Sequence, residues 1–143
     1  MIKLEYTPHP FKIKEENDKE WIWDDVRKRW VRLTPEEWVR QNFIQYLIKQ
    51  HNYPASLMAV EKEILLQDLR KRCDIVLYQA QKPWMIVECK EMSVPLNDVV
   101  LRQALTYNIS IPVPYLVITN GLAAHVYKRE DGALQPLTAL PAW

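Results

Sequence analysis

The segment Trp84–Glu88 (WMIVE) is almost continuously apolar, which is the pattern of a strand buried on both faces of a sheet. The segment Cys73–Tyr78 (CDIVLY) before it is equally rich in β-forming residues, and the QAQKP sequence between the two is typical of a turn. We therefore expect an antiparallel hairpin at the centre of a sheet. A strand buried on both faces needs other elements to cover the sheet, which favours an α/β fold.

Two helices are predicted to supply this cover. Thr34-Pro35-Glu36-Glu37 provides an N-cap, a proline at the first helical position and a glutamate two positions later, and HNYP at 51–54 ends this helix. The second helix is expected over about 97–109, before Pro112. Further strands are expected over 56–64, 115–119 and 124–128, and a β-hairpin over 21–33. The predicted fold is α/β, with a mixed central sheet flanked by two helices and the N-terminal hairpin as an added edge.

The 143 residues predict a single domain, because domains usually have roughly 100–200 residues. We divide it into an N-terminal hairpin extension (1–33), a core (34–128) and a C-terminal tail (129–143). With only 2 glycines, the chain cannot contain a glycine-rich phosphate loop, which excludes ATP motors and dinucleotide-binding folds. The formal net charge of +1 neither indicates nor excludes a nucleic-acid partner.

The location is expected to be cytoplasmic, with no membrane partner. No apolar run approaches the roughly 18–20 residues that span a bilayer, and the N-terminus lacks an apolar signal segment. The two cysteines, Cys73 and Cys89, match no zinc or redox spacing, and we expect both to be reduced.

Three charged residues of the hairpin are the candidate chemical site. A turn centred on Gln81 would place Asp74 directly opposite Glu88, where two like charges destabilise a sheet unless a cation compensates them. Mg²⁺ prefers such carboxylate oxygens. Lys90 lies two residues after Glu88 and therefore on the same face of the strand, where it could orient a water molecule. The alternative is a surface ion pair between Asp74 and Lys90, which contributes little.

These residues also carry a resemblance to a known family. Asp74, thirteen intervening residues and then Glu88-Cys89-Lys90 resemble the D…ExK signature of the PD-(D/E)XK nuclease superfamily, which has the restriction-endonuclease-like fold. RCDIVLY and PWMIVECKE, followed by Gln103-Ala-Leu-Thr-Tyr107 and PYLVITNG, are similar to the N-terminal nuclease domain of type I restriction enzyme R subunits, from about Thr34 to Lys128. Cys73 stands where the superfamily name has proline, but the proline is not a ligand.

The resemblance implies a set of roles. Asp74, Glu88 and the backbone carbonyl of Cys89 would hold Mg²⁺, with Mn²⁺ as a substitute, and Lys90 would act at the attacking water. Gln103 and Tyr107, four residues apart and hence neighbours on one helix face, would contact nucleic acid or support the lysine.

Three further assignments remain beside these roles. A helix glutamate often completes such sites and would be Glu37, with Glu36 less favoured, although Glu37 is also placed to serve only as the capping-box partner. Arg72 precedes Asp74 and would meet the phosphates. The basic cluster at 27–32 is interpreted as a solvated face, and the tryptophans as packing residues.

The expected function is therefore metal-dependent hydrolysis of DNA phosphodiester bonds. The alternative is a non-catalytic nucleic-acid-binding or assembly module that retains the nuclease fold. DNA is the expected partner, together with a possible separate motor or modification subunit, because these residues contain no phosphate loop. The sequence leaves the oligomeric state open.

Overall fold

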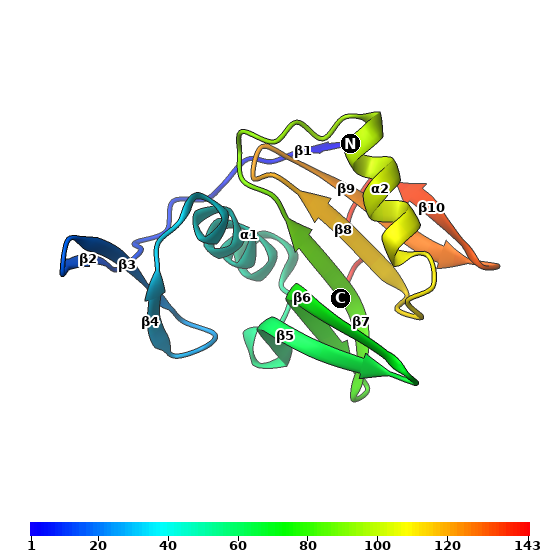
Figure 1. Ribbon diagram of the computed structural model, residues 1–143, viewed down its shortest axis with the longest axis horizontal. Coiled ribbons are helices and arrows are strands. Elements are labelled where there is room, and N and C mark those ends of the chain that lie inside the picture. The colour runs from blue at the N-terminus through cyan, green and yellow to red at the C-terminus, as the bar shows by residue number, and fades with distance from the viewer.

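A seven-stranded mixed sheet forms the centre of the molecule in the computed structural model, which describes residues 1–143 (Figure 1). The strand order is β1-β9-β8-β7-β6-β5. β10 also pairs with β9, at residues that follow the short stretch paired with β1. Neighbouring strands are antiparallel except β7 and β8, which are parallel. The strands are β1 (Ile2–Lys3), β5 (Met58–Leu66), β6 (Leu69–Gln79), β7 (Lys82–Cys89), β8 (Tyr115–Thr119), β9 (Ala123–Glu130) and β10 (Ala133–Leu137).

The central hairpin of β6 and β7 has the predicted register near its middle. Ile75 pairs with Val87, and the next two residues of β6 follow in step. The turn contains Ala80 and Gln81, both with positive φ, which is the backbone of a type I′ hairpin turn. Val87 and its two neighbours on the N-terminal side are almost inaccessible to solvent, so the expectation of a strand buried on both faces is confirmed.

The two helices cover opposite faces of this sheet (Figure 1). Helix α1 (Pro35–His51) packs residues such as Phe43 and Leu47 into one core, and α2 (Asp98–Asn108) packs Ala104 into the other. The Thr34 hydroxyl accepts the Glu37 backbone N–H at 3.0 Å, as the cap prediction requires. A short 3-10 helix, Ala55–Leu57, leads into β5. Neither helix is long and apolar enough to cross a membrane.

A separate three-stranded antiparallel sheet precedes α1. It consists of β2 (Ile13–Glu16), β3 (Lys19–Asp24) and β4 (Arg29–Arg32), in that spatial order. The predicted N-terminal hairpin is therefore present as β3 and β4, with β2 added along one edge. The expectation that it forms an added edge of the central sheet is wrong, because these strands pair only with one another. Ile22 of β3 is fully buried, so this small sheet has a core side and an outer side.

Both ends of the chain also join the main sheet, which the sequence did not indicate. β1 pairs with β9, and β10 forms within the segment expected to be a tail. β1 is too short to show an alternating pattern, and β10 contains Pro136, which is tolerated only at a sheet edge.

Candidate active site

The site begins where β6 and β7 separate. The backbone ladder ends at the Ile75–Val87 pair, one residue before the expected pairing of Asp74 with Glu88. Beyond that point the Asp74 side chain replaces a backbone hydrogen bond between the strands, because its Oδ2 accepts the backbone N–H of Cys89 at 2.8 Å. Asp74 thus bridges the two strands with its carboxylate.

The side-chain alternation of β6 is broken at this point. Cys73 packs in the core beneath α2, whereas Ile75 packs in the core beneath α1, although residues two apart on a regular strand share a face. The two cysteines consequently lie in different cores, with Cys89 on the α1 side. Both are buried free thiols, and burial raises the pKa of Cys73 to about 11.

Glu88 and Lys90 lie together at the end of β7. The Lys90 Nζ is 3.1 Å from Glu88 Oε1, and Asn108 of α2 donates from Nδ2 to Glu88 Oε2 at 3.3 Å. Both oxygens of this carboxylate therefore have a donor, and one of them is the lysine that the sequence placed on the same face.

The sequence predicted that the carboxylates of Asp74 and Glu88 share one face of the sheet. In the structure they do not share a face, but they line the same cavity. Asp74 takes its partner from α1 and Glu88 takes its partner from α2, and these helices lie on opposite sides of the sheet. Both residues nevertheless line one cavity of about 140 Å³, together with Arg72 and Asn108. The break in the ladder explains the difference, because Asp74 no longer follows the alternation from which the common face was predicted.

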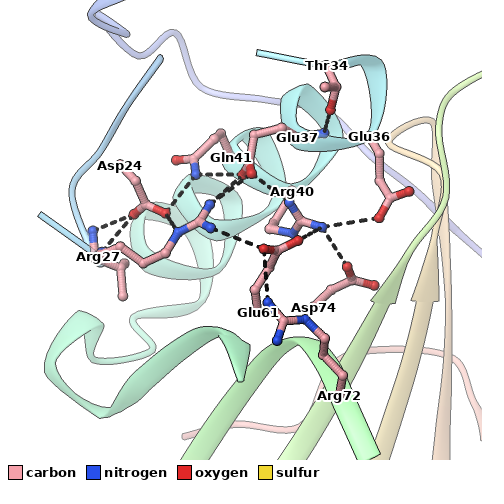
Figure 2. Close-up of polar contacts among 11 residues, drawn as sticks. Asp24, Arg27, Thr34, Glu36, Glu37, Arg40, Gln41, Glu61, Arg72 and Asp74 are labelled. Carbon is pink, nitrogen blue, oxygen red and sulfur yellow. Dashed lines mark hydrogen bonds and ion pairs between the residues drawn. The ribbon is translucent and has the colours of Figure 1, made fainter. Parts of the chain in front are cut away.

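A buried arginine of α1 connects the acidic residues (Figure 2). The Arg40 side chain is 4% exposed, and its Nη2 lies 2.7 Å from Asp74 Oδ1, 3.1 Å from Glu36 Oε1 and 3.2 Å from Glu61 Oε1. Its Nη1 donates to Glu37 Oε1 at 2.7 Å. Burial alone would lower the pKa of Arg40, but the hydrogen bond to Asp74 and the negative charge of Glu37 raise it on balance. Four carboxylates thus share one permanent cation.

Glu37, the helix glutamate assigned to the site, is held away from Asp74 by this network. Arg27 donates to both Glu37 oxygens at 2.9 Å, and Gln41 donates to Oε2 at 3.0 Å. Glu36, which the sequence disfavoured, shares Arg40 Nη2 with Asp74. Burial, and then the charge of Asp74, raises the pKa of Glu36.

The network extends to the N-terminal sheet through a second buried carboxylate. Asp24 accepts the backbone N–H groups of Val26 and Arg27 at 2.7 and 3.0 Å, and the Gln41 side chain at 3.0 Å. Burial would raise the pKa of Asp24, but the hydrogen bonds from Arg27 and Gln41 outweigh it and lower the pKa. The interpretation of the cluster 27–32 as a solvated face is therefore wrong for Arg27, whose side chain is almost completely enclosed.

The two α2 residues of the QxxxY spacing lie beside the hairpin charges. Gln103 and Tyr107 line a groove of about 510 Å³ with Glu88 and Lys90. Tyr107 is 65% exposed, and the Lys71 Nζ lies 4.1 Å from the centroid of its ring. These side chains are thus accessible to a large ligand that reaches the hairpin.

Arg72 lies at the rim of the other cavity. Its guanidinium is exposed and is 3.3 Å from Glu61. Arg72 lines the same cavity as Asp74, and its role in binding phosphates stays a prediction.

Asn108 is a site residue that the sequence analysis did not select. It is fully buried, and its Nδ2 donates to the carbonyl of Ala104 at 2.7 Å as well as to Glu88. Because both acceptors require the amide nitrogen, the orientation of the amide is fixed, and its Oδ1 has no partner. The signal that could have found it is its place at the last turn of α2, directly after Tyr107.

The cavity offers oxygen ligands for a hard cation. No three His, Cys, Asp or Glu side chains are grouped so as to hold a metal ion by themselves. Mg²⁺, however, commonly uses one or two carboxylates and keeps several waters. Asp74 and Glu88 are two such carboxylates, and Asn108, whose Oδ1 has no partner, lines the same cavity. The residues present fit a partly hydrated Mg²⁺.

Comparison with known proteins identifies one family. A family model described as the type I restriction enzyme R protein N terminus matches residues 35–141. The chain belongs to this family. The region shared with other type I R-protein N-terminal domains contains both helices and the hairpin of β6 and β7, and it leaves out the three-stranded N-terminal sheet. No curated protein and no solved structure matches the chain.

Proposed function

We propose that this R-protein N-terminal domain is a Mg²⁺-dependent nuclease of the PD-(D/E)XK type that hydrolyses DNA phosphodiester bonds. One observation carries the proposal: Asp74 and Glu88 line a single cavity where β6 and β7 separate, and Lys90 Nζ lies 3.1 Å from Glu88. The family and the D…ExK spacing support the same chemistry.

The residues divide the work as follows. Asp74, Glu88 and the backbone carbonyl of Cys89 would hold the cation, which would supply Lewis acidity for the attack of water on the phosphate. Lys90 orients the attacking water and stabilises negative charge on the phosphate. Asn108 keeps Glu88 Oε2 in place with its fixed amide.

Other parts of the site would bind the DNA. Gln103 and Tyr107 line the groove that contains Glu88 and Lys90, so a strand lying there passes the reacting groups. Arg72 supplies a positive charge at the rim of the neighbouring cavity. We expect the reaction to take place in the cytoplasm. DNA translocation would need a motor outside these residues, because they contain no phosphate loop.

The test compares metal binding with cleavage in three variants. Asp74→Ala and Glu88→Ala should each abolish Mn²⁺ binding in titration calorimetry and cleavage of single-stranded, duplex and branched DNA. Lys90→Ala should retain the metal, because it removes a positive neighbour and no ligand. Its turnover should fall by about 10²-fold or more, the usual contribution of a positioned acid or base.

Lys82→Ala is the control for these variants. Lys82 lies at the opposite end of β7, so its substitution should change neither metal binding nor cleavage. If Glu88→Ala binds Mn²⁺ and cuts DNA like the parent, the nuclease proposal fails. A binding or assembly module is then the better description.

A further inference from the structure

A second groove lies between the N-terminal sheet and the main domain. It has a volume of about 510 Å³, and one wall is β4, the edge strand of the small sheet. The other wall is formed by the first turn of α1 and by Glu61 of β5. This groove is separate from the groove beside α2, and none of its lining residues has a role in the function proposed above.

The charges that line this groove are of two kinds. Arg27 and Arg40, at its floor, are buried and already engaged by carboxylates of the network in Figure 2. Arg29 and Arg32, on the β4 wall, are exposed and have no ion-pair partner. The guanidinium of Arg32 lies over the ring of Trp21, 5.7 Å from its centroid, which leaves its N–H groups available.

The groove lies next to the candidate active site. Arg40 lines the groove and donates to Asp74 at 2.7 Å, so this one buried side chain connects the groove with the Asp74 carboxylate. The glutamates near the floor repel phosphates, whereas the arginines on the wall bind them with paired N–H donors. A polyanion is therefore attracted to the β4 wall, while the glutamates keep it away from the floor of the groove.

We infer that β4 is a nucleic-acid-binding edge, in which Arg29 and Arg32 bind backbone phosphates of the strand that leads to the active site. This inference rests on the proposed nuclease function and names residues outside the family match, which begins at residue 35. Arg29 and Arg32 are three residues apart, which places them about 10 Å apart and on opposite faces of this edge strand, so they would contact different phosphates along the edge. Such contacts do not depend on the base sequence.

The test measures DNA binding as a function of salt. The full chain, the double variant R29Q/R32Q and the control K3Q/K82Q are titrated into labelled duplex and single-stranded oligonucleotides, with EDTA present to prevent cleavage. Lys3 and Lys82 are exposed, have no ion-pair partner and lie on β1 and at the start of β7. The control thus removes the same two charges elsewhere on the molecule.

The inference predicts a change in the salt slope. Loss of two phosphate contacts should reduce the slope of log K against log [salt] by about 1.8 for duplex or about 1.4 for single strands. K3Q/K82Q should keep the slope of the parent chain. R29K/R32K retains both charges and should recover most of the slope, which separates charge from any effect on folding.

Three outcomes would overturn the inference. The parent and R29Q/R32Q could show the same slope and affinity, or the control could lose as much as the arginine variant, which would indicate only a general effect of charge. If the parent chain binds no DNA at any salt concentration, the proposed nuclease function fails together with this inference. The first two results leave that function standing.

Discussion

Arg40 is the residue on which the charge balance of the site depends. It lies among four carboxylates, is almost completely buried and forms the only ion pair of Asp74. Removing one partner of a buried ion pair leaves an uncompensated charge, which costs about 3–5 kcal/mol. We expect Arg40→Met to lower the free energy of unfolding by that amount in urea titrations.

The matched control for Arg40 is Arg70, an exposed arginine of β6. Arg70 is 71% exposed and lies 3.2 Å from Glu63, and exposed pairs of this kind contribute about 0–1 kcal/mol. Arg70→Met should therefore leave the unfolding curve almost unchanged. Equal losses in the two variants would contradict the role assigned to Arg40.

Asp24 should make the stability of the protein sensitive to acid. Its pKa is lower in the folded chain than in the unfolded chain, so the unfolded state takes up a proton first as the pH falls. The stabilisation from Asp24 is complete above the unfolded pKa of about 3.9 and is lost as the pH falls through the lower, folded pKa. Asp24→Asn should lower stability at pH 7 and weaken the loss between about pH 5 and pH 2, measured by thermal unfolding. A parent and variant with parallel pH profiles would refute this.

At the scale of elements, the start of α1 is set by its cap. Thr34 Oγ1 accepts the Glu37 N–H at 3.0 Å, and the Glu37 carboxylate does not complete the capping box because Arg27 and Arg40 bind it. Thr34→Ala should cost about 1 kcal/mol of unfolding free energy, the usual value for an N-cap. Thr34→Ser, which keeps the hydroxyl, should cost much less. A loss that is the same for both substitutions would show that the cap bond is not the cause.

The elements that the sequence predicted are those whose signal is local. Turn residues, caps and apolar runs gave both helices and the central hairpin with its register, and that register led to Asp74, Glu88 and Lys90. The residues it missed have their partners far away in the chain: Arg40 meets Asp74 34 positions later, and Asn108 meets Glu88 20 positions earlier. Such contacts depend on how helices are placed over the sheet, which no local pattern contains.

For the whole molecule, the boundary of the family match is not a boundary of folding. The match begins at residue 35, but Glu37 and Gln41 of α1 bind Arg27 and Asp24 from the preceding segment. A chain that begins at Thr34 would leave buried Glu37 with one arginine fewer and would also lack the core residue Leu4. We expect its free energy of unfolding to be lower by about 3 kcal/mol or more in urea titrations. Stability equal to that of the full chain would show that the N-terminal segment is merely attached.

The β1–β9 pairing has a consequence for how the protein is made. Tyr6 Oη donates to the carbonyl of Gly121 at 2.6 Å, across 115 positions of the chain, and β1 pairs only with β9. Synthesis proceeds from the N-terminus, so the first strand leaves the ribosome long before its partner exists. β1 and Tyr6 are therefore among the last segments to be fixed. Arg27 and Asp24, by contrast, have their partners Glu37 and Gln41 within the next 17 positions of the chain, so the charges beside α1 can pair long before β1 finds its place in the sheet.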